Sequence, residues 1–321
     1  MQSETRLFRT RDFRLASGTV LPELQLAYAT YGKLAPDGCN AVLATHGFTS
    51  DHHAAGMRPN GTPGWWSGLI GPGTPIDTDR LYVVASNMLG SSYGSTAPKS
   101  TNPKPGRPYG PEFPAITLTD IVGAQKAMLD HLGVKHLVAV AGPSYGGFQG
   151  FQWAVSYPDF MDGIVAAVTA PKGLGGSDAA DKLQARLATD PNWNGGHYYD
   201  KGGIGQVMTA IRAETLKLYG VEADLAATIP DPVKREQAIQ RMAAEWATEF
   251  DGNGMLALRR AMAHFDASRD FRRIKARFLY VLSRTDKLVP PSLAPEVMGA
   301  LKVAGVDATY FELDSELGHM A

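Results

Sequence analysis

The chain has 321 residues, with 31 lysines and arginines against 32 aspartates and glutamates, a formal net charge of −1 and 44% hydrophobic residues. The near-neutral balance argues against a protein that binds nucleic acid or an anionic membrane, and the apolar content excludes intrinsic disorder. A chain of this length buries about three quarters of its unfolded surface, which is enough for a large core in one or two domains.

The first residues and the cysteine content indicate the compartment. The N-terminus begins Met-Gln-Ser-Glu-Thr-Arg and lacks the apolar stretch of a signal peptide. No run approaches the roughly 18 apolar residues of a membrane helix. Cys39 is the only cysteine, so an intrachain disulfide is impossible. We therefore expect a soluble, cytoplasmic protein.

Short apolar runs recur along the chain and are typical of strands buried on both faces of a parallel sheet. In chain order they are residues 42–45, 81–86, 136–141, 164–170, 278–283 and 309–313. Helical patterns lie between them. Ile121, Ala124 and Met128 recur at steps of three and four residues, and Gly133 follows as a stop signal. This alternation predicts an α/β fold with a mainly parallel central sheet flanked by helices.

Three stretches interrupt the alternation. Residues 58–75 and 98–114 are dense in proline and glycine but lie beside strands, so we interpret them as ordered loops near a site. Residues 173–272 contain helical patterns without strands, including Val207, Ile211 and Leu218 on one face. We predict that 173–272 form an inserted helical lid and that 1–172 and 273–321 form the core domain. The alternative is a helical subdomain that merely covers core surface.

The pattern Gly-x-Ser-x-Gly occurs twice, and the context of each occurrence differs. Residues 90–94 lead into Ser-Thr-Ala-Pro-Lys-Ser-Thr-Asn-Pro, which cannot form a helix. Gly142-Pro-Ser144-Tyr-Gly146 follows the strand 136–141 and precedes a helical run. A strand-to-helix turn of this kind raises a serine above the sheet edge, and small flanking residues permit the sharp turn. Ser144 is therefore the candidate nucleophile; the alternative is an ordinary glycine-rich turn.

A serine nucleophile needs a base, and the base needs a group that orients it. Asp286 follows the strand 278–283, at the carboxyl end where such sheets carry functional residues. His319 follows the last predicted strand, 309–313. Serine, acid and histidine in this order form one of the known triad arrangements. We assign His319 as the base and Asp286 as the group that fixes its tautomer; a turn-forming role is the alternative for Asp286.

Acyl transfer also needs hydrogen-bond donors for the oxyanion. The backbone N–H of Tyr145, at the predicted helix start, is one candidate, and that of Phe48, after the strand 42–45, is the second. His52 and His53 do not predict a metal site, because adjacent side chains diverge and no His-Glu-x-x-His motif occurs. We expect neither a metal nor a bound cofactor.

With these residues placed, the chain resembles the homoserine O-acetyltransferase family, whose members have the α/β-hydrolase fold. The matching motifs are His46-Gly-Phe-Thr, His52-His53-Ala-Ala-Gly, Gly64-Trp-Trp-Ser-Gly-Leu-Ile-Gly-Pro-Gly, Ile76-Asp-Thr-Asp-Arg80, Asn87-Met-Leu-Gly, Gly94-Ser-Thr, Tyr109-Gly-Pro-Glu-Phe-Pro and Gly146-Gly-Phe-Gln. The resemblance runs from about residue 28 to residue 319. It implies an α/β-hydrolase fold with a helical lid, a ping-pong reaction through Ser144, and a homodimer contact that the lid often carries.

Two departures from the family concern the acceptor. Members that use homoserine typically carry an arginine where this chain has Tyr93, and an aspartate directly after the catalytic histidine, where it has Met320. The resemblance implies that these positions recognise the carboxylate and the amine of the amino acid. Tyr93 and Met320 lack the complementary charges, which argues against homoserine as the acceptor.

A third departure is the end of the chain. The resemblance implies another helix after His319, whereas Ala321 is the last residue. Either the sequence is truncated at this end, or the histidine lies on a loosely held end, which is mobile unless it is docked.

Three functions remain open. The first is a carboxylic ester hydrolase for small acyl groups, with a small-molecule ester as substrate and water as acceptor. The second is an acyl-CoA-dependent O-acyltransferase with another alcohol acceptor, in which acetyl-CoA is a co-substrate and the cations within 269–277 lie near the entrance, although such a run is usually solvated surface. The third is a non-catalytic binding protein on the same fold, against which the complete Ser144, Asp286 and His319 set argues.

Overall fold

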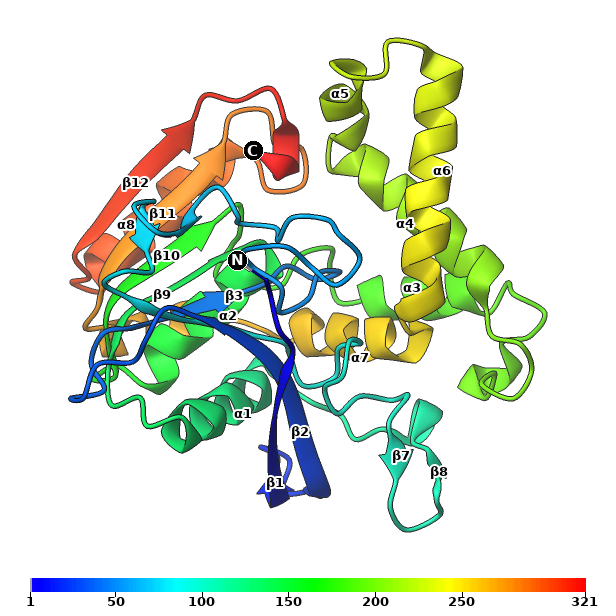
Figure 1. Cartoon of the computed structure of the whole chain (residues 1–321), viewed down its shortest axis with the longest axis horizontal. Coiled ribbons are helices and arrows are strands. Elements are labelled where there is room, and N and C mark those ends of the chain that lie inside the picture. Colours follow the sequence, from blue (N-terminus) through cyan, green and yellow to red (C-terminus); the bar gives the residue numbers. More distant parts are fainter. Residues whose placement is uncertain (1) are drawn as a thin grey trace.

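The computed structural model describes residues 2–321 and builds them around one eight-stranded sheet (Figure 1). Across the sheet the strands follow the order β1-β2-β6-β3-β9-β10-β11-β12. From β6 to β12 all neighbours are parallel, whereas the pairs β1–β2 and β2–β6 are antiparallel. The strands span β1 (Arg6–Arg14), β2 (Val20–Tyr31), β3 (Ala41–Thr45), β6 (Tyr82–Ser86), β9 (Leu137–Pro143), β10 (Met161–Ala167), β11 (Arg277–Ser283) and β12 (Ala308–Leu313). The predicted α/β fold with a mainly parallel sheet is confirmed.

The six strands expected from apolar runs all form, with one clear shift. The run 164–170 predicts a strand that ends at residue 170, but β10 ends at Ala167 because Val168 has a φ of 43°, outside the extended region. The hairpin β1–β2 was not expected. In β1 only Phe8 is buried, so this strand carries no apolar run that the sequence could show.

The two faces of the sheet are covered differently. Helices α1 (Leu118–His131), α2 (Tyr145–Ser156) and α8 (Ala294–Val303) contact the sheet or one another, with Trp153 of α2 fully buried. A separate apolar cluster joins Val42 and Val83 of the sheet to Ala54 and Ile70 of the loop that follows β3. This loop includes the two-residue strands β4 (Ile70–Gly71) and β5 (Ile76–Asp77). Another short ladder, β7 (Thr101–Asn102) with β8 (Arg107–Pro108), lies in the second proline-rich loop.

Five helices stand between β10 and β11 and lie to one side of the sheet (Figure 1). They are α3 (Ala179–Leu187), α4 (Gly205–Leu218), α5 (Val221–Ala226), α6 (Pro232–Glu249) and α7 (Gly252–Ala263). The two ends of this insertion are tied together, since Gly173 N–H donates to the Phe265 carbonyl at 2.8 Å and Ala267 N–H to that of Pro171 at 2.9 Å. The helical content expected for 173–272 is therefore present, while its independence as a domain stays a prediction.

The sequence pattern wrongly predicts one of three residues on the packed face of helix α4. Val207 and Ile211 are buried, but Leu218 is 50% exposed. The last turn of α4 instead packs Leu216 against Ile239 of α6. Among residues 2–321, none of the helices has the length and apolar content needed to cross a membrane.

Candidate active site

Ser144 stands at the turn between β9 and α2, where the sequence places it. Its φ of 55° and ψ of −119° lie in a region that residues other than glycine rarely adopt. A Cβ added at Gly142 would collide with the Thr45 side chain, and one at Gly146 with the Thr45 carbonyl. Glycine is needed at both positions because the turn presses directly against the end of β3.

The backbone of Ser144 is held while its side chain is free. Its N–H donates to the Ala167 carbonyl at 2.8 Å, and its carbonyl accepts from Thr169 Oγ1 at 2.8 Å. The residue is half-buried, and its hydroxyl has no hydrogen-bond partner within residues 2–321. The serine is thus presented on a fixed turn with an unengaged oxygen.

Asp286 and His319 meet at the carboxyl end of the same sheet. Asp286 Oδ2 lies 2.7 Å from His319 Nδ1, and the two residues are 3% and 7% exposed. The other carboxylate oxygen accepts backbone N–H groups from Leu288 at 2.8 Å and Val289 at 3.0 Å. The carboxylate is therefore aimed at Nδ1, and His319 Nε2 is buried without a partner in the described part of the chain.

His319 is docked on two sides rather than left on a free end. It belongs to a short 3₁₀ turn, Gly318–Met320, in which Gly318 N–H donates to Thr285 Oγ1 at 3.0 Å. On the other side its ring lies 4.9 Å from the ring of Tyr219, just after helix α4. A Cβ added at Gly220 would come within 2.8 Å of the Leu317 carbonyl, so the helical insertion and the last residues of the chain are in contact.

The two expected oxyanion donors flank Ser144. The rings of Phe48 and Tyr145 stack at 5.6 Å and 23°. The loop that carries Phe48 passes beside the serine, since a Cβ added at Gly47 would lie 3.8 Å from Ser144 Cβ. Within residues 2–321, neither Phe48 N–H nor Tyr145 N–H donates to another group. Two free backbone donors are thus available next to Ser144.

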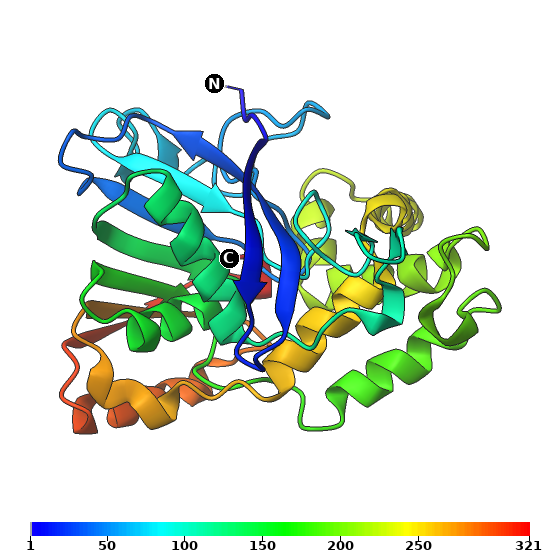
Figure 2. The same cartoon turned by 90° about the horizontal axis from the view of Figure 1, so that it is seen from below.

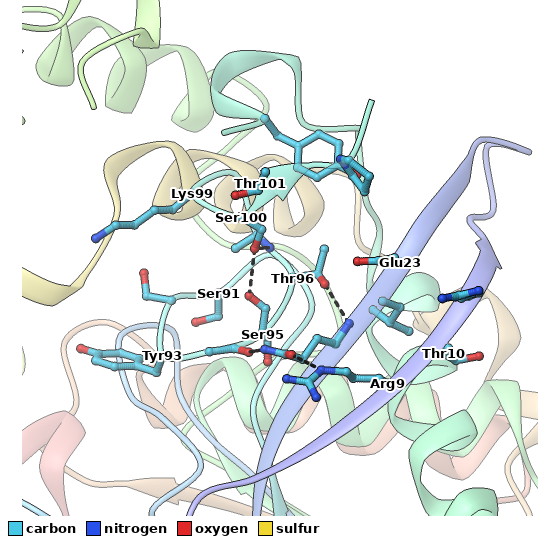
Figure 3. A pocket seen from close by; sticks show the side chains of 18 of the residues that line it. Arg9, Thr10, Glu23, Ser91, Tyr93, Ser95, Thr96, Lys99, Ser100 and Thr101 are labelled. Carbon is cyan, nitrogen blue, oxygen red and sulfur yellow. Dashed lines mark hydrogen bonds between the residues drawn. The ribbon is translucent and has the colours of Figure 1, made fainter. Parts of the chain in front are cut away.

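Tyr93 and Met320 lie in different surroundings. Tyr93 lines a cavity of about 740 Å³ between the hairpin β1–β2 and the loop after β6, on the side away from Glu23 (Figure 3). The cavity lining contains neither Ser144 nor His319. Burial and the nearby charge of Asp51 raise the pKa of Tyr93, so the phenol stays neutral. The side chain of Met320 is 52% exposed and does not reach this cavity.

Arg212 of α4 is a candidate site residue that the sequence patterns do not reveal. Its Nη1 donates to Thr49 Oγ1 at 2.7 Å, one residue after Phe48, and its guanidinium lies 5.1 Å from the Trp246 ring. Within residues 2–321 it has no carboxylate partner, and its Nε is buried and unpaired. Burial lowers its pKa. The sequence signal is a cation four residues after buried Met208 and seven before Tyr219, on the packed face of a helix.

Residues 40–321 match the protein family described as alpha/beta hydrolase fold. This match, the mainly parallel sheet and the serine on a strand-to-helix turn define the class of the molecule as an α/β-hydrolase.

Similar proteins narrow this class. The homoserine O-acetyltransferase of Methanosphaerula palustris is 37% identical, over 96% of this chain and 67% of its own length. The crystal structure of homoserine O-acetyltransferase from Bacillus anthracis has a TM-score of 0.89 at 26% identity, over 100% of this chain and 93% of its own. Esterase E22 has a TM-score of 0.89 at 28% identity, over 99% and 95%. The chain belongs to the homoserine O-acetyltransferase-like family of α/β-hydrolases and is an enzyme of the acyltransferase or esterase kind.

Proposed function

We propose that this enzyme transfers small acyl groups through an ester on Ser144. The observation that carries the proposal is the buried 2.7 Å contact between Asp286 Oδ2 and His319 Nδ1. A carboxylate at this nitrogen holds the ring proton on Nδ1, so the unpartnered Nε2 is the acceptor for the serine proton. Ser144 Oγ attacks the acyl carbon as His319 takes its proton, and His319 then protonates the leaving group.

The charge that develops on the acyl oxygen needs fixed donors. We assign this role to the N–H groups of Phe48 and Tyr145, which have no other acceptor in the described chain and flank Ser144. Tyr145 begins α2, so its N–H also contributes the positive end of the helix dipole. Loss of one donor of this type costs about 10²–10³ in rate.

For the second half-reaction, the first candidate is hydrolysis of small acetyl-type esters. Tyr93 is uncharged and Met320 is exposed, so the two positions expected to recognise an amino-acid acceptor provide no charge. Water then takes the acyl group from Ser144. The similarity to esterase E22 supports this candidate.

The second candidate is transfer to an alcohol that carries a carboxylate, with acetyl-CoA as the acyl donor. Arg212 favours it, because this half-buried cation contacts the loop of Phe48 and has no acidic partner within residues 2–321. A substrate carboxylate would supply the missing charge. The similarity to homoserine O-acetyltransferases supports this candidate.

Stopped-flow release of p-nitrophenol from p-nitrophenyl acetate tests the proposal and separates the candidates. We expect a burst that Ser144→Ala abolishes; a burst retained in that variant would overturn the nucleophile assignment. Fast turnover after the burst supports hydrolysis. A burst that stalls and resumes on addition of a hydroxy acid, but not of an uncharged alcohol, supports transfer.

A further inference from the structure

The first residues of the chain lie across the loop that carries Phe48. Gln2 pairs with Met57 in a parallel bridge, and Ser3 N–H donates to the Met57 carbonyl at 2.9 Å. Ser3 is 4% exposed, whereas the side chain of Thr5 lies at the surface. We call residues 2–5 the N-terminal clamp.

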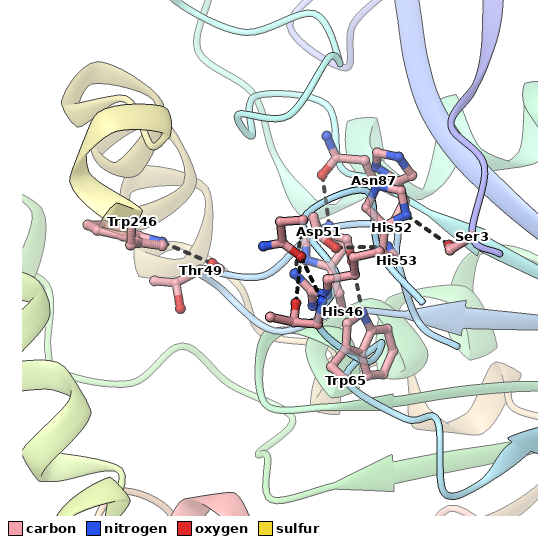
Figure 4. A network of polar contacts seen from close by, with 12 residues as sticks. Ser3, His46, Thr49, Asp51, His52, His53, Trp65, Asn87 and Trp246 are labelled. Carbon is pink, nitrogen blue, oxygen red and sulfur yellow. Dashed lines mark hydrogen bonds and ion pairs between the residues drawn. The ribbon is translucent and has the colours of Figure 1, made fainter. Parts of the chain in front are cut away.

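Two buried histidines are the residues that the clamp holds. Ser3 Oγ lies 2.8 Å from His53 Nδ1 (Figure 4). Thr5 Oγ1 lies 2.8 Å from His52 Nε2 and 3.3 Å from His53 Nε2. The two imidazole rings are 4.3 Å apart, and the residues are 2% and 8% exposed. Three of the four ring nitrogens therefore meet a clamp hydroxyl.

The histidines end the segment 47–53, which begins beside Ser144. Within it, Asp51 Oδ1 accepts from His53 N–H at 2.8 Å, and Asp51 Oδ2 pairs with Arg58 at 2.8 Å. Trp65 Nε1 donates to the Asp51 carbonyl at 2.9 Å. These contacts hold the segment from Asp51 to His53, so its position there limits where Phe48 can lie.

The hydroxyls and rings form a continuous hydrogen-bonded chain. It runs from Tyr31 Oη, which lies 2.7 Å from Ser3 Oγ and accepts from Ala55 N–H at 3.1 Å, through Ser3, His53 and Thr5 to His52 Nε2. In either direction along the chain, the hydroxyls of Ser3 and Thr5 each donate to one neighbour and accept from the other. Each hydroxyl has one proton and each neutral ring one N–H, so removal of one hydroxyl leaves a buried nitrogen unpaired.

We propose that Thr5 and Ser3 are positioning residues, which hold His52 and His53 and thereby fix the Phe48 N–H beside Ser144. The inference rests on the proposed function, since in that function the Phe48 N–H stabilises the oxyanion. The helical insertion holds the same segment at its middle, where Trp246 Nε1 donates to the Thr49 carbonyl at 3.1 Å (Figure 4). Arg212 also donates to the Thr49 hydroxyl. The N-terminal clamp holds the other end of this segment, at His52 and His53.

Thr5 is the better position for a test, because its side chain is exposed whereas that of Ser3 is buried. Thr5→Val removes the hydroxyl at constant shape, Thr5→Ser keeps it, and Thr19→Val is a matched control on an exposed threonine whose side chain makes no hydrogen bond within residues 2–321. For p-nitrophenyl acetate we expect Thr5→Val to lower kcat about 10-fold with KM unchanged, because a displaced donor weakens only transition-state binding. Thr5→Ser should restore kcat.

Amide hydrogen exchange of residues 46–57, read by mass spectrometry, gives a second readout that needs no catalysis. We expect faster exchange in Thr5→Val and wild-type exchange in Thr5→Ser and Thr19→Val. Unchanged exchange in Thr5→Val, faster exchange with unchanged kcat, or a kcat loss that Thr5→Ser does not restore would each overturn the proposal. Absence of a burst in the wild type would instead contradict the proposed function, and the exchange data would still decide whether Thr5 holds the segment.

Discussion

Asp286 and Arg212 are two charged side chains at the site, and they differ in how their charge is compensated. The Asp286 carboxylate accepts two backbone N–H groups and contacts His319, so its capacity for hydrogen bonds is used within the chain. Arg212 contacts the hydroxyl of Thr49 and the ring of Trp246, and it pairs with no acidic side chain within residues 2–321. Arg212 is half-buried, and a charge partly removed from water without an acidic partner is costly, so this guanidinium is the cation that the proposed carboxylate acceptor would pair with.

Asp286→Asn should lower the reaction rate while leaving the stability of the fold nearly unchanged. The amide oxygen still accepts from Leu288 and Val289, while the amide nitrogen faces His319 Nδ1 and favours the wrong tautomer. We expect the burst rate with p-nitrophenyl acetate to fall by about 10⁴. The thermal midpoint should change little. Asp314→Asn, at an exposed aspartate paired with Arg284, is the control, and an equal loss there would contradict the assignment.

Arg212→Met should change selectivity more than stability. Hydrogen bonds to charged groups contribute about 1.5–3 kcal/mol, so the ratio of acceptor use between a hydroxy acid and an uncharged alcohol should fall about 10- to 100-fold. Methionine removes the buried charge at similar length, so unfolding in urea should show a loss of no more than about 1 kcal/mol. Arg186→Met, at an exposed lid arginine paired with Glu214, is the control. An equal loss with both acceptors would show that Arg212 serves the fold.

At the scale of elements, the turn between β9 and α2 is the tightest contact of the site. Gly142→Ala would force the new methyl group into Thr45 of β3, so we expect a loss of about 1–3 kcal/mol in unfolding free energy and a weaker burst. Gly299→Ala in α8 meets nothing within 4 Å and should gain about 0.5–1 kcal/mol through helix propensity. Urea denaturation of both variants checks this contrast; a stable Gly142→Ala would show that β3 can move away.

The segment 47–53 should make stability depend on pH. Burial, the neighbouring His53 and the charge of Arg58 lower the pKa of His52 to about 3, against an attraction from Asp51 that opposes the shift. The imidazole of His52 therefore binds a proton near pH 6.5 in the unfolded chain, but only near pH 3 in the folded chain. Stability is fully present above pH 6.5 and falls between these values by up to about 1.4 kcal/mol per pH unit.

Urea unfolding of the wild type and of His52→Gln from pH 7 to pH 4 measures this slope. As the pH falls, the unfolding free energy of His52→Gln should decrease less steeply than that of the wild type, by up to about 1.4 kcal/mol per pH unit. His136→Gln, at a partly exposed histidine that contacts Asp162, is the control. Parallel slopes for the wild type and His52→Gln would contradict the buried neutral ring.

On the scale of the whole molecule, one apolar core joins the sheet and the helical insertion. The main cluster contains Phe151 and Tyr280 of the sheet region together with Ile211 and Leu258 of the insertion. We therefore expect a single unfolding transition, with far-ultraviolet circular dichroism and tryptophan fluorescence giving the same midpoint in urea. Trp153 lies in the core and Trp246 in the lid, so fluorescence reports on both. Two separated transitions would show that the lid unfolds independently.

Local patterns were sufficient for the parts of the site that depend on neighbours in sequence. Six strands, the turn at Ser144 and the positions of Asp286 and His319 after their strands all follow from apolar runs and the residues that end them. The reason is that a buried strand requires apolar residues, and a tight turn requires small residues, within a stretch of only a few positions. The hairpin β1–β2 was not predicted. Its outer strand, β1, has one buried side chain and shows no apolar run. Its inner strand, β2, is mostly buried between Leu21 and Tyr31, and its apolar residues are a signal that the prediction missed.

Contacts between distant segments required the folded chain. Arg212 meets Thr49 across 163 residues, Thr5 meets His52 across 47, and Tyr219 packs on His319. No periodicity predicts which polar group a lid helix or a terminal strand brings to a loop, because that depends on how the elements dock. The order of Ser144, Asp286 and His319 is therefore readable along the chain, whereas the contacts of Arg212 and of the N-terminal clamp arise only when the sheet, the helical insertion and the N-terminal residues pack together.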